Sequence, residues 1–332
     1  MDKKSRMQYL IEQLNLASDA YYGGAAEYMS NYEWDGMFDE LSALENETGI
    51  VLPNSPTQII SRSKMDDAEP IGGNKELHEY AALSLAKTKN VSDLQSWAAE
   101  KKVWLSWKLD GLTLVLTYDN GILSKILTRG DGVTGINITY MKEAIEGFPI
   151  EIEYKKHLVV RGEALILYSD FERINEYFDN ENGRYANPRN LASGTLALDP
   201  ANIDIVKERC LKFISFSLVH LDDKIVSWGE RMDFLDHLGF STVEREETDA
   251  NFLPSIINAW SQKVEQGQID TPVDGLVICY DDTEFAATGN VTGHHATRAG
   301  LAFKWQDEVA ITTLEHIEWS CAASVITPVA VF

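Results

Sequence analysis

The chain has 332 residues, enough for two or three domains, because single hydrophobic cores stop growing at about 250–300 residues. Its 29 basic and 52 acidic residues give a formal net charge of −23, so the average surface repels nucleic-acid phosphates. Binding to nucleic acid would therefore need a local basic groove or help from a partner.

Two further absences narrow the class of protein. Cys210, Cys279 and Cys321 are isolated, with no Cys-x-x-Cys pair, so the sequence predicts neither a zinc site nor a disulfide framework. No segment approaches the roughly 18–20 apolar residues of a membrane span, and the polar N-terminus is unlike a secretory signal. We expect a soluble, cytoplasmic protein with no membrane partner.

The first segment is predicted to be helical. Between about Ser5 and Glu47 apolar residues recur at spacings of three and four, interrupted at residues 21–24. Residues 52–57 (LPNSPT) end this pattern, and residues 61–75 are predicted to form a polar linker or exposed loop. We therefore predict a small helical domain over residues 1–72.

From Ala81 onward the pattern indicates strands with a few helices. Ser92 and Asp93 can cap a short helix, and Asp119-Asn120-Gly121 predicts a hairpin turn. Helices are also expected at 168–180 and 228–238, and strands at 104–107, 112–118, 122–128, 158–160, 164–167, 210–218, 275–279 and within 309–332. Without regular βαβ alternation these elements predict an α+β fold with antiparallel sheets. The main domain would cover 73–308, with incomplete strands of another over 309–332.

Charged residues in a telling order are spread over this strand-rich region. The segment Lys108-Leu109-Asp110-Gly111 lies between two predicted strands, although a single Lys-x-Asp-Gly match is weak by itself. Further along the chain come Arg129, Glu163, Asp274 and Lys304. A lysine nucleophile, a glutamate for ribose hydroxyls, an acidic residue on a strand and a late lysine, in that order, are typical of covalent nucleotidyltransferases.

Other segments carry a resemblance that covers nearly the whole chain. They are Tyr21-Tyr22, Ser30–Asp35, Ser55–Gln58, His78 with Leu83-Ser84-Leu85, Thr128–Gly132 and Asn187–Asn190. With the lysine motif, they resemble the NAD-dependent DNA ligase family. The N-terminal helices are similar to a small domain that only the NAD-dependent branch carries, so the resemblance implies the adenylation core of such an enzyme.

The resemblance implies a reaction and the residues that perform it. Lys108 would attack the α-phosphorus of NAD, release nicotinamide mononucleotide and carry AMP to the 5′-phosphate of a nick in double-stranded DNA. Asp110 and Lys304 would also be catalytic. A lysine amine attacks only when it is unprotonated, so we expect Lys108 to be buried beside cationic groups. Mg²⁺ would bind through the phosphates and Asp274, and would neutralise phosphoryl charge together with Lys304.

Binding roles follow from the same resemblance. Aromatic rings and a carboxylate would hold the cationic nicotinamide half, because rings stack on it and the carboxylate meets its charge. Arg189 would contact DNA. The residues expected to bind the cofactor are Tyr21, Tyr22, Trp34 and Asp35 for the nicotinamide half, and Ser84, Leu85, Arg129, Glu163, Asp274 and Lys304 for the remainder.

Several positions depart from the family pattern. Ser106 stands where glutamate is usual, and Cys279 stands where a phosphate-binding lysine is usual. Asn31 replaces an aspartate, Ala197 stands where an arginine is usual, and residues 322–324 replace a Gly-Arg-Thr-Gly segment. These differences are expected to affect substrate geometry and DNA contact more than the nucleophile. Without a lysine at position 279, Lys304 would have to neutralise more of the phosphate charge.

The C-terminal residues resemble the early part of an OB domain, which the family follows with a zinc module, helix-hairpin-helix motifs and a BRCT domain. The strand at Val325–Phe332 would present an unpaired apolar edge. The sequence thus predicts a second subunit, as in a two-subunit bacteriophage ligase, that completes the OB fold and supplies DNA-binding charge. The location would be the cytoplasm of a bacterium or of a phage-infected host.

Two other functions are considered. A triphosphate-dependent RNA ligase or capping-type nucleotidyltransferase would share the lysine motif, but residues 1–60 speak against it. A structural subunit with reduced catalysis would explain Ser106, Cys279 and Ala197, but the retention of Lys108 speaks against it.

Two local patterns are interpreted without a binding role. Gly130–Gly135 matches the Gly-x-Gly-x-x-Gly of dinucleotide-binding folds, but it follows a predicted hairpin instead of lying inside a βαβ unit. Glu246 and Glu247 are expected to be solvated loop charges.

Overall fold

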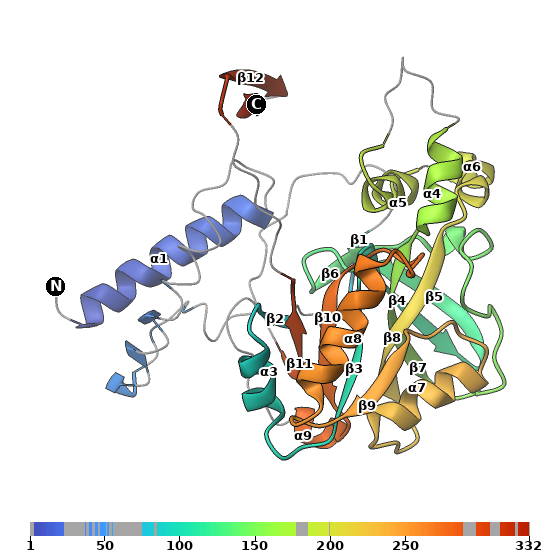
Figure 1. Ribbon diagram of the computed structural model, residues 1–332. Coiled ribbons are helices and arrows are strands. Elements are labelled where there is room, and N and C mark those ends of the chain that lie inside the picture. Colours follow the sequence, from blue (N-terminus) through green and yellow to red (C-terminus); the bar gives the residue numbers. More distant parts are fainter. Residues whose placement is uncertain are drawn as a thin grey trace. The chain divides into compact units, whose positions relative to one another are not determined.

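The computed structural model divides the chain into two compact units, which are described in turn. Residues 69–291 and 295–305 belong to the larger unit, and residues 1–68, 292–294 and 306–332 to the smaller one. The residues that the structure describes are 3–22, 37, 40–41, 44–45, 47–50, 52, 55, 75–82, 85–176, 185–198, 200–287, 297–305, 313–322 and 325–331. The larger unit contains two main sheets and most of the helices (Figure 1).

The first sheet of the larger unit has five strands in the order β2-β11-β10-β3-β9. Neighbouring strands are antiparallel except β2 and β11, which run parallel. The bounds are β2 Leu85–Thr88, β3 Val103–Leu109, β9 Arg245–Thr248, β10 Val273–Tyr280 and β11 Thr297–Phe303. Lys108 is therefore carried by an interior strand, with β10 and β9 on its two sides.

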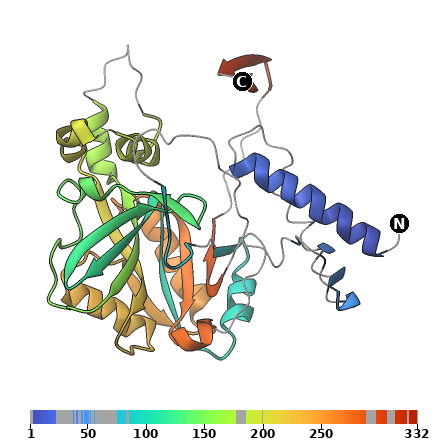
Figure 2. The same cartoon turned by 180° about the vertical axis from the view of Figure 1, so that it is seen from behind.

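The second sheet has four antiparallel strands in the order β5-β4-β7-β8. Figure 2 shows the larger unit from behind, with the green strands of this sheet toward the viewer. The bounds are β4 Leu112–Asp119, β5 Ile122–Thr128, β7 Leu158–Leu165 and β8 Lys212–Leu221, and a short pair joins β1 Lys75–Leu77 to β6 Thr134–Ile136. The chain passes from the first sheet to the second at Gly111. A Cβ there would lie 2.2 Å from the carbonyl oxygen of Ala164, so glycine is required for this crossing.

The predicted hairpin at residues 119–121 is confirmed. Asn120 and Gly121 have φ angles of +52° and +79°, the left-handed conformation that a tight two-residue turn requires. The turn joins β4 to β5, with Asp119 directly opposite Ile122. β4 begins directly after the lysine motif, and because the turn reverses the chain, β5 runs back along β4 and ends just before Arg129.

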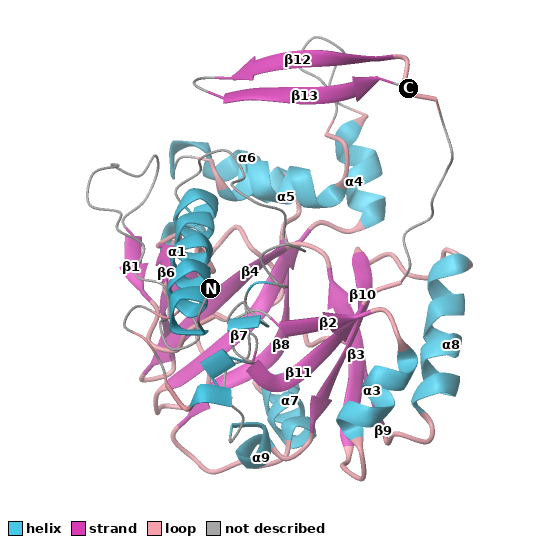
Figure 3. Cartoon of the chain, turned by 90° about the vertical axis from the view of Figure 1, so that its left-hand side faces the viewer, coloured by secondary structure: helices cyan, strands magenta, loops and turns pink. Residues whose placement is uncertain are grey.

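The helices lie at the ends and on the outer faces of the sheets. Their bounds are α3 Val91–Ala98, α4 Tyr168–Asn175, α5 Pro188–Leu196, α6 Ile203–Glu208, α7 Trp228–His237, α8 Leu253–Glu265 and α9 Thr283–Ala287, with 3-10 turns η1 Thr139–Met141 and η2 Pro200–Asn202. Figures 1 and 3 both show α4, α5 and α6 gathered at one end of the sheets. Asn187 caps α5 by accepting a hydrogen bond from the Asn190 amide, 2.8 Å away, and Pro188 follows at the first helical position.

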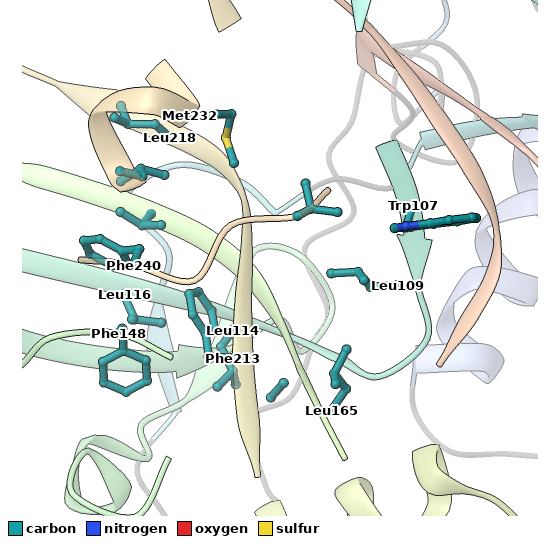
Figure 4. Close-up of a cluster of buried hydrophobic side chains, with 14 of the residues drawn as sticks. Trp107, Leu109, Leu114, Leu116, Phe148, Leu165, Phe213, Leu218, Met232 and Phe240 are labelled. Atoms are coloured by element: carbon teal, nitrogen blue, oxygen red, sulfur yellow. The ribbon is translucent and has the colours of Figure 1, made fainter. Parts of the chain in front are cut away.

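One continuous hydrophobic core joins the two sheets. Figure 4 shows Trp107 and Leu109 of β3 in the same cluster as Leu114 of β4 and Phe213 of β8. Tyr118 is fully buried among them, and its hydroxyl donates to the carbonyl oxygen of Pro149 at 2.6 Å. Close packing of this kind resists relative movement of the sheets, so polar side chains at their shared end keep a fixed spacing.

Some sequence-based boundaries were wrong. β7 is one strand from Leu158 to Leu165, where two strands at 158–160 and 164–167 were expected. Arg161 and Glu163 interrupt the apolar pattern, but β4 and β8 bond the strand on both sides and keep it extended. Glu246 and Glu247 were expected in a loop, yet they lie on the edge strand β9, opposite β3.

The smaller unit begins with α1, Lys3–Tyr22, as the helical pattern predicted. Met7, Leu10 and Leu14 are buried together with Leu41, which shows that the following segment packs against this helix. The Arg6 guanidinium reinforces that packing by donating to both carboxylate oxygens of Glu40, at 2.8 and 2.7 Å. Much of the predicted helical segment after Tyr22 lies outside the described residues.

The same unit contains a C-terminal hairpin of β12, His316–Ala322, and β13, Val325–Val331. The two strands pair antiparallel, with His316 opposite Val331 and Ala322 opposite Val325. The expectation of an unpaired terminal strand is therefore wrong, because β12 bonds one of its edges. Within the part of the chain that the structure describes, no helix is long and apolar enough to cross a membrane.

Candidate active site

Three predicted site residues meet at the end of the five-stranded sheet. Lys108 Nζ donates to one carboxylate oxygen of Asp274 at 2.6 Å, and Lys304 Nζ lies 2.8 Å from the other. The side chains of Lys108, Asp274 and Lys304 are 23%, 26% and 36% exposed, so the cluster is half-buried but open to a ligand. Lys108 was expected to be buried beside cationic groups, but its direct ionic partner is the carboxylate of Asp274, and Lys304 contacts the other oxygen of that carboxylate.

The backbone of β10 explains how Asp274 reaches both lysines. Gly275 pairs with Lys108 of β3, but the register shifts between Val273 and Gly275, so Asp274 has no partner in the ladder. Such an irregularity re-aims a side chain that would otherwise follow the strict alternation of a strand. A Cβ on Gly275 would lie 2.1 Å from the Phe303 carbonyl oxygen, so glycine is needed here for β11 to approach.

Electrostatics hold Asp274 ionised. Its partial burial acts to raise the pKa, but the hydrogen bonds and positive charges of Lys108 and Lys304 outweigh burial and keep the pKa below its ordinary value. A carboxylate bonded to two ammonium groups fixes their separation. The pair of lysines thus remains in place without an anionic ligand, and their charges face the same end of the sheet.

Glu163, on the second sheet, is in the opposite state. Its side chain is buried, and burial raises its pKa to about 7, although the Thr113 hydrogen bond and the charges of Arg189, Lys108 and Arg129 act in the other direction. Thr113 Oγ1 donates to Glu163 at 2.9 Å from the facing position on β4. Near neutral pH this carboxyl therefore exists in both protonation states and can donate as well as accept hydrogen bonds.

Asp110 and Arg189 form an ion pair beside the nucleophile. Arg189 Nη1 lies 2.6 Å from Asp110 Oδ1, and the arginine side chain is 53% exposed. Arg189 is in the first turn of α5, so the pair ties that helix to the loop between β3 and β4. The structure thus places the predicted DNA-contacting arginine at the site itself, in contact with the Lys-x-Asp-Gly motif.

Arg129 follows β5 and is exposed. Its amide donates to the Thr113 carbonyl oxygen at 3.0 Å, and its own carbonyl oxygen lies 3.0 Å from His78 Nε2. Gly130 and Gly132 have φ angles of +54° and +89°, and the chain then enters the short strand β6. A strand follows this glycine segment where a dinucleotide-binding motif would have a helix, in agreement with the interpretation of residues 130–135 from the sequence.

Several cofactor-binding predictions fall wholly or partly outside the described residues. Leu85 is the first residue of β2, in the same sheet as Lys108, while Ser84 is not described. Tyr21 and Tyr22 end α1 in the smaller unit, but their side chains are not described. Trp34 and Asp35 also lie outside the described part. The nicotinamide half of the predicted site therefore stays a prediction.

Lys87, which was not predicted from the sequence, stands beside this cluster. It lies on β2 directly opposite Ala302 of β11. The side chain keeps contact with solvent, yet the surrounding protein removes part of its hydration, which lowers its pKa, and the nearby Lys304 and Lys108 lower it further. Residues two apart on a strand lie on the same face, so the spacing of Lys87 from Leu85, a predicted cofactor-binding residue, could have indicated that Lys87 is near the site.

The two departures near the nucleophile have clear places in the sheet. Ser106 is buried on β3, two residues before Lys108 and opposite Val277. Cys279 lies on β10 opposite Trp104, and burial raises the pKa of its thiol to about 12. A thiol with that pKa is neutral at physiological pH, so β10 provides no positive charge at this position.

The described residues do not fit a metal held by protein ligands alone. They contain no group of three or more His, Cys, Asp or Glu side chains arranged to hold an ion. Both carboxylate oxygens of Asp274 already accept bonds from lysines. The lysine amines instead make this end of the sheet suited to an anionic group such as a phosphate.

Comparison with known proteins identifies the family. Residues 74–308 match the NAD-dependent DNA ligase adenylation domain, and residues 1–61 match the DNA ligase-like, N-terminal NAD+-binding domain. A DNA ligase of Lachnoclostridium phytofermentans is 40% identical over 333 residues, covering 99% of this chain and 50% of the relative. One of Ruminiclostridium cellulolyticum is 40% identical over 334 residues, covering 100% and 49%.

The chain spans about half the length of the curated relatives it matches. Among solved structures, mycobacterial DNA ligase D complexed with ATP and MES matches with a TM-score of 0.37 and 16% identity, over 68% of this chain and 60% of that one. The adenylation-domain match at residues 74–308 covers more than half of the 332 residues. The chain therefore belongs to the NAD-dependent DNA ligase family.

Proposed function

We propose that this chain adenylates itself from NAD. Lys108 attacks the α-phosphorus, a nitrogen–phosphorus bond forms, and the phosphorus–oxygen bond to nicotinamide mononucleotide breaks. The Lys108 ammonium group loses one proton to water before the attack, and its nitrogen loses a second one to water afterwards. The mononucleotide leaves with the electrons of the broken bond on its phosphate oxygen, and AMP remains as a phosphoramide. The observation that carries this proposal is the joint contact of Lys108 and Lys304 with Asp274, at 2.6 and 2.8 Å.

The surrounding residues have distinct roles in the proposed reaction. Lys304 neutralises charge that builds up on the phosphoryl oxygens, since its ammonium group lies beside that of the nucleophile. Glu163 binds the ribose hydroxyls, because a carboxyl with a pKa of about 7 can donate to one and accept from another. Arg129 helps to orient the nucleoside, and Asp110 acts through its ion pair with Arg189.

The nicotinamide half is assigned to the N-terminal unit. The match of residues 1–61 to an NAD+-binding domain supports Tyr21, Tyr22, Trp34 and Asp35 as its binding residues. The same match disfavours a triphosphate as donor, because ATP has no nicotinamide half for this domain to bind. It also disfavours a purely structural subunit.

Mg²⁺ is proposed to reach the site with the phosphates of the substrate. Phosphate oxygens are ligands that Mg²⁺ prefers, and it seldom relies on a cage of protein groups alone. When bound, it would supply further positive charge at the phosphate. No step above depends on it, because the lysines themselves meet the phosphate.

The later steps are also proposals. AMP would pass from Lys108 to the 5′-phosphate of nicked double-stranded DNA, with Arg189 contacting the DNA, in the cytoplasm of a bacterium or of a phage-infected host. A second subunit would supply DNA-binding charge, and a bacteriophage origin would fit such an arrangement. The net charge of −23 supports the need for this help, since DNA affinity depends on cations that neutralise phosphates.

The requirement for a second subunit can be measured as nicked-duplex binding and multiple-turnover sealing by the purified chain at near-physiological salt. We expect weak binding that falls further as salt rises, and little sealing. Efficient sealing by this chain without added protein would contradict the two-subunit proposal, but it would leave the adenylation proposal intact.

The adenylation proposal is tested by intact mass. The chain incubated with NAD and Mg²⁺ should gain the mass of one AMP, whereas ATP and Mg²⁺ should leave the mass unchanged. A gain from ATP alone would overturn the assignment of NAD as donor. Deletion of residues 1–60 is the matched control, and it should abolish the gain from NAD.

A further inference from the structure

Lys87 shares one face of the five-stranded sheet with the nucleophile. Residues directly opposite each other on paired strands lie on the same face. Lys87 is opposite Ala302, Ala302 is opposite Val277, and Val277 is opposite Ser106. Because faces alternate along a strand, Ser106 and Lys108 also share a face, so Lys87 projects from the face that bears Lys108.

The neighbouring residues let the Lys87 side chain reach the site. Ala302 separates Lys87 from β10, and its side chain is a single methyl group, the smallest apolar side chain that could stand there. Adjacent strands are about 4.8 Å apart, so β10 lies about 10 Å from β2, and the four-carbon stem of Lys87 covers part of that gap by crossing over β11. One residue further along, the Lys304 amide donates to the Thr88 carbonyl oxygen at 3.0 Å, which fixes β2 beside the late lysine.

The charges at this end of the sheet are unbalanced. Lys108 and Lys304 share the carboxylate of Asp274, and among the described residues no carboxylate is paired with Lys87. Burial lowers the pKa of Lys87, and the charges of Lys304 and Lys108 lower it further, while Asp274 acts in the other direction. In a chain of net charge −23, three amines around one carboxylate form a local site for an anion.

The neutral thiol of Cys279 belongs to the same face. Cys279 lies opposite Gly300 and Trp104, in the next row of this face beyond Val277. The central strand β10 thus contributes no cation there, and Lys87 of the edge strand β2 stands in the adjoining row of the same face, with Ala302 and Val277. We propose that Lys87 binds the diphosphate of the nucleotide substrate and supplies the positive charge that Cys279 does not, an inference that rests on the proposed self-adenylation.

The first test is the single-turnover rate of self-adenylation from NAD. Lys87→Met should lower the rate at subsaturating NAD by roughly 10- to 100-fold, the size expected for a hydrogen bond to a charged group. Lys87→Arg should recover much of it, because it keeps the charge. Lys102→Met is the matched control. It removes an exposed lysine that lies six residues before Lys108, roughly 20 Å along the strand direction at about 3.4 Å per residue. The rate should stay unchanged in this variant.

The second test moves the charge back to β10. In the variant that carries both Lys87→Met and Cys279→Lys, the rate should rise at least several-fold above that of Lys87→Met alone. Thermal melting checks that each variant is folded, and Lys87→Met should melt like the wild type because this side chain is exposed. A rate for Lys87→Met equal to that of Lys102→Met would overturn the proposal while self-adenylation by the wild type stood.

If the wild type gains no AMP, the role of Lys87 can still be tested by measuring how tightly NAD binds. NAD is titrated by calorimetry into Lys108→Ala, and into the same variant with Lys87→Met, so no covalent step can occur. We expect the dissociation constant to rise roughly tenfold when Lys87 is replaced. Equal constants, or no binding of NAD to the variant that retains Lys87, would overturn the role of Lys87.

Discussion

Each of the two main sheets of the larger unit carries an acidic side chain, and the pKa of the two carboxyl groups is shifted in opposite directions. On the five-stranded sheet, Asp274 is ionised because two lysines bond to it. On the four-stranded sheet, Glu163 is buried with a pKa of about 7 and accepts a hydrogen bond from the neutral Thr113 hydroxyl. The same chemical group is thus a fixed anion on one sheet and a titrating acid on the other, and the difference arises from the neighbours.

This contrast matches the two parts of a nucleotide. A phosphate is an anion and needs cations, which the first sheet supplies around Asp274. A ribose is neutral and needs groups that donate and accept hydrogen bonds, which Glu163 can do near neutral pH. The continuous core between the sheets holds these two environments at a fixed spacing.

The largest expected effect comes from neutralising Asp274. Asp274→Asn keeps the shape but removes the charge that holds Lys108 and Lys304 together, so the lysines repel each other and the nucleophile loses its fixed position. We expect the single-turnover rate of self-adenylation to fall by roughly 10²–10³-fold, as for other losses of a preorganised charged group. The measurement is the rate of AMP gain at saturating NAD.

Asp223→Asn is the control for that variant. Asp223 forms an exposed ion pair with Lys156 at 2.5 Å, away from the lysine cluster, and its replacement should leave the rate within twofold. If Asp274→Asn also stayed within twofold, the shared carboxylate would have no part in positioning the nucleophile.

A smaller effect is expected on stability from Glu163→Gln. The folded pKa is about 7 and the ordinary value is 4.5, so between these pH values the folded protein keeps a proton that the unfolded chain has released. The free energy of unfolding of the wild type therefore falls as pH rises from about 4.5 to about 7, by at most about 3 kcal/mol from this group. A glutamine side chain does not titrate, so the stability of this variant relative to the wild type should increase over that range.

Urea unfolding at pH 5 and at pH 8 measures this difference. Tryptophan fluorescence is a suitable signal, because Trp107, Trp228 and Trp260 are buried in the core of the larger unit. Glu151→Gln is the matched control, since its carboxyl is 75% exposed. A relative stability of Glu163→Gln that is equal at both pH values would show that Glu163 is not a titrating buried acid.

Local signals in the sequence predicted much of this fold. The turn at Asn120-Gly121 and the alternation around it predicted β4 and β5, and the Lys-x-Asp-Gly segment was correctly placed between strands. The order of Lys108, Glu163, Asp274 and Lys304 predicted one site, and the two sheets bring them to a common end. In each case the information lies within a few residues of the feature.

Nonlocal pairing accounts for what the sequence analysis missed. The parallel pairing of β2 with β11 places Lys87 opposite Ala302, a partner more than 200 residues away, and no local pattern specifies that contact. The register shift at Asp274 depends on the pairing of β10 with β3, again a property of two distant segments. β9 was missed because its charged residues give no apolar alternation.

The most direct test of the central claim is to locate the AMP. After incubation with NAD and Mg²⁺, the chain is digested and the peptides are mapped by mass spectrometry under conditions that preserve a phosphoramide. The account predicts one AMP, on Lys108, and no gain in Lys108→Ala or Lys108→Arg, both with Lys87 and Lys304 intact. AMP on another residue, or an undiminished gain in Lys108→Ala, would contradict it.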